Sequence, residues 1–289
     1  MISENTRLQV IENIKHSAES GEFYNKVEVN DPVLTADQSR AITDAFVENR
    51  MKLGFKIKSK VACYAADVAM RVINKDTEII GLEKIPDNIG GVIITSNHFS
   101  PFENTIIRFL NQKMGRKKLN IICQDSNFAM SGPIGFIMNY ANTIPINTQP
   151  RYLARDFLSI LKEKLVVKKE TVLLYPEQEM WFNYKKPRPP KGGAYFYAAK
   201  LNIPVISCFV EMIDTGIPDG KTGQFNKLRF KLYVLDVLFP DKDKTPKENT
   251  EALAAADYKL KKECYEAVYG EKLNYKFETS DIAGYKVNK

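Results

Sequence analysis

The segment Gly91–Glu103, GVIITSNHFSPFE, is the clearest structural signal in the chain. It joins a β-branched run to a polar turn and then to a helix start. The run GVIITS is the strongest strand signal in the chain. His98 follows it directly. In open α/β sheets, ligands and catalytic groups collect at the carboxyl ends of strands. We therefore expect His98 to lie at a functional site.

Outside this segment, from residue 77 onward, short β-branched runs alternate with stretches of helical periodicity. The predicted strands are 77–82, 91–96, 119–123, 143–147, 171–175, 204–210 and 228–237, and the predicted helices are 101–114, 134–141, 150–168, 192–202 and 247–270. This alternation predicts an α/β fold with helices on both faces of a sheet. No clear linker interrupts it, so we predict one catalytic domain, residues 76–289, after an N-terminal segment, residues 1–75.

Composition places the chain among folded, water-soluble proteins. Its 289 residues are 44% hydrophobic and 27% charged, with net charge +7, which excludes collagen, low-complexity disorder and disulfide-stapled miniproteins. The four cysteines form no CxxC pair, which favours free thiols over a metal site. We expect no metal and no cofactor. The chain has no signal peptide and no apolar run long enough to span a bilayer, so we expect a cytoplasmic protein.

The basic charge is concentrated in residues 50–75, which carry seven basic residues and one acid. One apolar stripe follows the same segment at spacings of three and four: Leu53, Ile57, Val61, Tyr64, Val68 and Val72. The spacing predicts one long helix or two within residues 41–75. A lysine-flanked apolar stripe is typical of a helix lying on an anionic membrane surface, which would place the protein peripherally on the inner face of the membrane. The alternative is that the stripe packs on the catalytic domain.

His98 and Glu103 allow two interpretations. A histidine is a suitable general base near neutral pH, and a carboxylate five residues on can orient its ring. In the alternative, Ser100, Pro101 and Glu103 form a capping box that starts the next helix, and His98 is structural.

A second polar block supports the catalytic interpretation. Leu173–Glu177 ends another strand on a carboxylate. The stretch from Met180 to Asn202 then carries five Lys or Arg residues and no acid, and leads through Gly192 and Gly193 into a helix start. Such a basic loop suits an anionic head group, while an exposed surface loop is the alternative.

Together these segments resemble the lysophospholipid acyltransferase family, which includes bacterial 1-acylglycerol-3-phosphate acyltransferases. The family's Asn-His-x4-Asp block is similar to Asn97–Glu103, and its Phe-Pro-Glu-Gly-Thr-Arg-Ser block is similar to Tyr175–Trp181. Its Lys-Lys-Gly-Ala-like element matches Lys191–Ala194, and its Val-Pro-Val strand matches Ile203–Ile206. The resemblance covers roughly residues 77–240.

The resemblance implies a mixed sheet flanked by helices and an acyltransferase activity without a covalent intermediate. His98 would deprotonate an acceptor hydroxyl, supported by Glu103, and the donor would be acyl-CoA or acyl carrier protein. The acceptor would be a lysolipid, and its anionic part would contact Lys191 and Arg151. The remaining residues assigned to substrate binding are Asn97, Ser100, Glu177 and Gly192, where Glu177 either binds an acceptor hydroxyl or orients the basic loop.

Three positions depart from the family pattern. Glu103 stands where the family has Asp, and Thr148 and Met180 align with arginines associated in the family with the acceptor's phosphate. Either Arg151, Arg188 or Lys191 replaces these arginines from nearby, or the acceptor is not a simple glycerol phosphate.

Other functions stay open at this point. One is a hydrolase that uses His98 with water, although no Gly-x-Ser-x-Gly elbow is present. Another is a non-catalytic, membrane-surface lipid-binding protein on the same scaffold. Nucleic-acid binding is not expected, because the basic face is confined to one helix and no recognition motif accompanies it.

Overall fold

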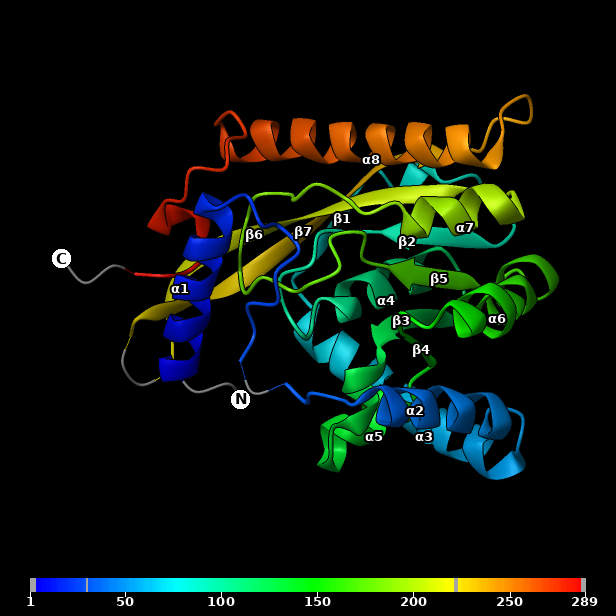
Figure 1. The fold of residues 1–289 in the computed structure, drawn as a ribbon. Helices are drawn as coiled ribbons and strands as arrows, with labels where there is room; N and C mark the ends of the chain where they lie inside the picture. Colours follow the sequence, from blue (N-terminus) through cyan, green and yellow to red (C-terminus); the bar gives the residue numbers. More distant parts are fainter. Residues whose placement is uncertain (1–3, 30, 221–222, 287–289) are drawn as a thin grey trace.

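The computed structural model describes residues 4–29, 31–220 and 223–286. These residues form one seven-stranded sheet flanked by helices (Figure 1). The strands are β1 (Glu78–Ile80), β2 (Val92–Thr95), β3 (Leu119–Gln124), β4 (Thr143–Ile146), β5 (Thr171–Leu174), β6 (Val205–Asp219) and β7 (Phe225–Leu238). Their order in the sheet is β1-β7-β6-β2-β5-β3-β4, and all neighbours are parallel except β6 and β7. The predicted mixed α/β sheet is confirmed.

The helices follow the predicted positions with shifted ends. They are α1 (Glu4–Glu19), α2 (Ala36–Asn49), α3 (Leu53–Ile73), α4 (Asn104–Lys113), α5 (Gly132–Tyr140), α6 (Leu158–Lys162), α7 (Gly193–Leu201) and α8 (Pro246–Tyr269). The helix expected at 150–168 exists as α6 with π-helical turns on both sides. Residues 41–75 belong to two helices, α2 and α3. No helix within the described residues has the length and apolarity to cross a membrane.

The β6–β7 hairpin is the largest departure from the predicted bounds. β6 continues nine residues beyond the expected end at residue 210, because β7 pairs with it along almost its whole length. Thr215-Gly216-Ile217-Pro218 reads as a turn in the sequence. In the structure the pairing register shifts between Asp214 and Pro218. Such an irregularity accommodates a proline, which has no N–H for the ladder.

β2 is buried on both faces of the sheet, as the apolar run predicts. Val92 and Ile94 pack into the core cluster that contains Ile107 of α4, whereas Ile93 packs into the opposite cluster, which contains Ala198 of α7. The alternation of successive side chains across a strand produces this division. The sheet therefore has an apolar core on each side.

The connections that leave the neighbouring strands β2 and β5 run in opposite directions across the sheet. From β2 the chain passes through α4 to β3 on one side, and from β5 it passes through α7 to β6 on the other. The two connections therefore diverge from the carboxyl ends of β2 and β5. Ligands bind at such a switch point in open α/β sheets.

The N-terminal residues extend along this same carboxyl edge (Figure 1). α1 packs on a third apolar cluster with Trp181 and Phe225. At the other end, Ser39 of α2 hydrogen-bonds Asp125 and Asn147, which follow β3 and β4. The chain between α1 and α2 thus crosses the ends of β2 and β5.

Substitutions at Gly90 and Gly91, directly before β2, test how closely the start of this strand packs against the chain at Leu165. A Cβ on Gly91 would lie 1.9 Å from the backbone oxygen of Leu165, whereas a Cβ on Gly90 meets no atom within 4 Å. Because backbone atoms must move, we expect Gly91→Ala to lower the free energy of unfolding by about 1–3 kcal/mol. Gly90→Ala is the matched control and is expected to change it little. Urea unfolding of both variants measures the difference, and equal stabilities would contradict this packing.

Candidate active site

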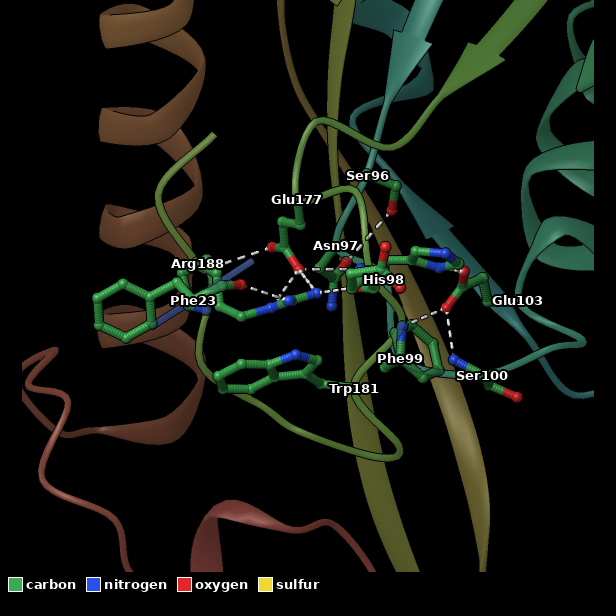
Figure 2. A network of polar contacts seen from close by, with 12 residues as sticks. Phe23, Ser96, Asn97, His98, Phe99, Ser100, Glu103, Glu177, Trp181 and Arg188 are labelled. Atoms are coloured by element: carbon green, nitrogen blue, oxygen red, sulfur yellow. Dashed lines mark hydrogen bonds and ion pairs between the residues drawn. The ribbon is translucent and has the colours of Figure 1, made fainter. Parts of the chain in front are cut away.

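Contacts with Glu177 and Glu103 hold the backbone and the ring of His98 at the carboxyl end of β2 (Figure 2). Its backbone N–H donates to Glu177 Oε2 at 3.3 Å, and its carbonyl accepts from the Trp181 N–H at 3.1 Å. Its ring contacts Glu103 through Nδ1 and stacks on Tyr175, with ring centroids 4.1 Å apart and planes 6° apart. Position and ring orientation of His98 are therefore both set by protein groups.

Glu103 connects the imidazole to the loop that carries it. One carboxylate oxygen contacts His98 Nδ1, and the other accepts from the backbone N–H groups of Phe99 and Ser100, the latter at 2.7 Å. The carboxylate is 3% exposed. These bonds are the Glu103 half of a capping box, so the two interpretations of this residue are compatible in one geometry.

The other half of the capping box is absent. The Glu103 N–H donates to the Ser100 carbonyl, and the Ser100 hydroxyl accepts from Phe102 N–H. Consequently α4 begins at Asn104 instead of at residue 101, and residues 101–103 form a turn.

The contact at Nδ1 also determines the tautomer of His98. A carboxylate can only accept hydrogen bonds, so Nδ1 carries the proton and Nε2 presents a lone pair. Among the described residues no protein group bonds Nε2. The site therefore offers a base at Nε2 and an anion behind it that stabilises the protonated ring.

Tyr175 has a role that the sequence patterns did not predict. Burial, together with the nearby Glu103 carboxylate, raises its pKa well above the usual value, so the phenol stays neutral. A neutral ring lies flat on the imidazole without adding charge beside it.

Glu177 is the second carboxylate at this site, after Glu103, and it is buried in a network with Arg188 (Figure 2). Its Oε2 accepts from Arg188 Nη2 at 3.0 Å, and its Oε1 accepts from the Arg188 backbone N–H at 3.1 Å. Arg188 also donates to the Phe23 carbonyl at 2.9 Å and lies over the Trp181 ring. The guanidinium thus holds the loop, in contrast to the expectation that Arg188 replaces a family arginine at the substrate.

The structure brings together most of the other predicted site residues. Asn97 bonds the backbone N–H and carbonyl of Val210 at 2.8 and 3.0 Å, which ties the His98 loop to β6. Lys191 and Gly192 are exposed on the loop beyond Arg188, and the Lys191 ammonium lies 3.7 Å from the ring centre of Tyr24. Arg151 is exposed after β4, three strands away from β2 in the sheet order.

Comparisons with known proteins agree with the resemblance seen in the sequence. A family model described as acyltransferase matches residues 76–211. The fold is similar to the crystal structure of the 1-acyl-sn-glycerophosphate (LPA) acyltransferase PlsC from Thermotoga maritima, with a TM-score of 0.50 and 16% sequence identity. That alignment covers 82% of this chain and 99% of that one. No curated protein sequence matches the chain at a significant level.

The buried Glu177–Arg188 pair predicts a large stability effect. In Glu177→Gln, the guanidinium stays buried without its counter-charge, and we expect the free energy of unfolding to fall by about 3 kcal/mol. Urea unfolding measures this change. Glu263→Gln removes the exposed Lys259–Glu263 pair and serves as the control, with no measurable effect expected. A Glu177→Gln protein as stable as the control would contradict the role given to this pair.

Proposed function

We propose that this protein moves a fatty acyl group from an acyl thioester to a hydroxyl of a lysophospholipid-type acceptor, and the match of residues 76–211 to the acyltransferase family model supports this proposal. The observation that carries the proposal is the His98–Glu103 contact at the carboxyl end of β2. It leaves a basic nitrogen open to substrate and places a buried carboxylate on the opposite side of the ring.

In this mechanism His98 Nε2 takes the proton of the acceptor hydroxyl as its oxygen attacks the thioester carbonyl. Glu103 stabilises the imidazolium that forms, and Tyr175 keeps the ring in plane. The carbon–sulfur bond then breaks, the ester bond is complete, and the proton returns from His98 to the leaving thiolate. Glu177 and Asn97 act by positioning the loop that carries His98.

The proposed donor is acyl-CoA or acyl carrier protein. Lys191 is exposed on the loop beyond Arg188, and it is the proposed contact for anionic groups of a substrate. Gly192 and Ser100 are proposed to contact the same substrate, whereas Arg151 reaches a substrate only if the substrate extends toward β4. The proposed division into residues 1–75 and 76–289 is supported by the family match, which begins at residue 76.

The first test is His98→Ala. Loss of a general base typically lowers the rate by about 10²–10⁴, and we expect such a loss with little change in melting temperature. The assay follows labelled acyl-CoA with and without a lysolipid, which also distinguishes transfer from thioester hydrolysis. Wild-type turnover by the variant would show that His98 is structural.

Substitution of Glu103 distinguishes its two roles, which are to hold the loop N–H groups and to stabilise the imidazolium. Glu103→Gln retains a carbonyl for the loop N–H groups but cannot stabilise an imidazolium, so we expect acyl transfer to fall by at least about 10². Thermal melting shows whether the loop survives. Equal activity of the two proteins would leave Glu103 with a purely structural role. Glu103→Asp, the family residue, is expected to keep partial activity.

α3 supports peripheral binding to a membrane. The apolar stripe of this helix faces solvent along its whole length, with Leu53 74% and Tyr64 71% exposed. The opposite side of α3 packs on α4 and α5. Lys56 and Lys60 are exposed beside the stripe. Apolar residues flanked by lysines suit the interface of an anionic bilayer, where each basic residue contributes roughly 1 kcal/mol. We propose that α3 holds the protein on the inner face of the membrane.

Sedimentation with anionic vesicles tests this role. We expect wild type to pellet at low salt and to be released at high salt, because screening weakens the attraction. The variant Lys52/Lys56/Lys60→Glu should stay in the supernatant. The control Lys247/Lys259/Lys262→Glu makes the same change of charge on α8, at the opposite end of the molecule (Figure 1), and should pellet like wild type. Equal behaviour of the two triple variants would rule out α3 as the docking surface.

A further inference from the structure

Residues 23–29, here called the N-terminal arm, lie against the His98 loop although they are outside the acyltransferase domain. The Phe23 carbonyl accepts from Arg188 Nη1 at 2.9 Å, and the Asn25 carbonyl accepts from Trp181 Nε1 at 3.1 Å. Trp181 in turn bonds the His98 carbonyl. Val27 is fully buried in the cluster beneath α1. These contacts anchor the arm before Glu28, and Val29, which packs against the same cluster, anchors it after Glu28.

Glu28 is the acidic residue of the arm, and the catalytic mechanism does not use it. Its Oε1 is buried and has no hydrogen-bond partner. The charged groups that act on this carboxyl are His98, Asp31 and Lys26. Burial, with a smaller contribution from Asp31, raises the pKa of Glu28 to about 7. A buried polar atom without a partner is costly, so this oxygen is suited to a hydrogen-bond donor from outside the protein.

The cations of residues 23–29 and 176–192 are all in contact with protein groups. Arg188 binds Glu177, Lys186 binds Asp281, Lys26 binds Asp31, Lys185 lies over the Tyr269 ring and Lys191 lies over the Tyr24 ring. The Glu28 carboxyl forms no ion pair among the described residues, although His98 and Lys26 act on it electrostatically. An anion placed beside it would be repelled, whereas an ammonium would form a charge-assisted hydrogen bond.

We propose that Glu28 forms part of the acceptor site and selects an acceptor whose head group carries an ammonium, with the reacting hydroxyl directed to His98. The inference rests on the proposed acyl transfer and specifies its acceptor. Glu28 binds the ammonium and takes no part in bond making, so it is a specificity-determining residue. A neutral donor, such as a second hydroxyl, would satisfy Oε1 but would not stabilise the ionised carboxylate.

Three lysolipids with the same acyl chain test the proposal: lysophosphatidylethanolamine, lysophosphatidylglycerol and 1-acylglycerol-3-phosphate. The first two are both phosphodiesters, and the ammonium is present only in the ethanolamine lipid. We expect kcat/KM for the ethanolamine lipid to exceed that for each of the others by about tenfold or more, as one charge-assisted hydrogen bond allows. Glu28→Gln should abolish this preference by lowering kcat/KM for the ethanolamine lipid to about the value for the glycerol lipid. Glu19→Gln, an exposed carboxylate at the end of α1, is the control.

The pH dependence supplies an independent readout. Only ionised Glu28 attracts an ammonium strongly. The preference of wild type for the ethanolamine over the glycerol lipid should therefore increase as pH rises through about 7, and it should be flat in Glu28→Gln. Taking the ratio of the two substrates cancels every pH effect that the two reactions share.

Folding of the variant is checked separately. A carboxyl whose pKa is raised by folding destabilises the protein above its unfolded pKa, with the full loss above about pH 7. Glu28→Gln should therefore melt no lower than wild type at pH 8. A lower melting temperature would mean that Glu28 is not desolvated as described, and would overturn the proposal.

The remaining outcomes separate this proposal from the function on which it rests. Acylation of 1-acylglycerol-3-phosphate or the glycerol lipid in preference to the ethanolamine lipid overturns the ammonium site and leaves acyl transfer standing. If none of the three is acylated, the proposed function fails. In that case head-group selection is still tested by equilibrium binding of short-chain forms of the ethanolamine and glycerol lipids. Equal affinities for the two lipids would overturn the proposed ammonium site.

Discussion

The carboxylate of Glu177 joins the parts of the molecule that make the site. It accepts from the backbone N–H of His98 at the end of β2, and it binds Arg188 on the loop that leads into α7. The β2–β5 ladder ends at the pair Thr95 and Leu174, and the two strands then send their connections to opposite sides of the sheet. Beyond the ladder, one buried anion shared between a backbone N–H and a guanidinium holds the two connections together. It also explains why Arg188 of the basic loop is buried, since this arginine is bound within the protein.

The N-terminal segment adds further hydrogen bonds to the network around Glu177. The Phe23 carbonyl accepts from Arg188, and the Asn25 carbonyl accepts from the Trp181 indole. These contacts join residues that are 165 and 156 positions apart, and α1 and α2 anchor the segment at the two ends of the sheet's carboxyl edge. The His98 loop is therefore held in part by chain outside residues 76–211, which the family model matches. This arrangement gives the arm a place beside His98, where it is able to influence which acceptor is used.

α3 illustrates the limit of a periodic pattern. The spacing of its apolar residues predicts a helix correctly, but periodicity does not say what covers the apolar face. Inside a domain such a stripe is normally core, yet here the buried residues of α3 are Ala62 and Met70 on its other side, and the side chains of the stripe face solvent. An uncovered stripe of this length is uncommon on a monomeric soluble protein and usually marks an interaction surface.

The sequence alone was sufficient for the strands of the core, the alternation that makes the fold α/β, and the pairing of His98 with Glu103. All of these are local: a core strand is a continuous apolar run, and a carboxylate five residues after the histidine returns to it within a single turn. The full length of β6 was not predictable, because a cross-strand partner stabilises β6 beyond its apolar run. The tertiary structure alone decided that Arg188 binds Glu177, that Tyr175 stacks on His98, that Arg151 lies three strands away, and that the N-terminal arm lies against the His98 loop. Each of these depends on which strand ends become neighbours, and residue spacing along a chain carries no information about contacts made across a sheet.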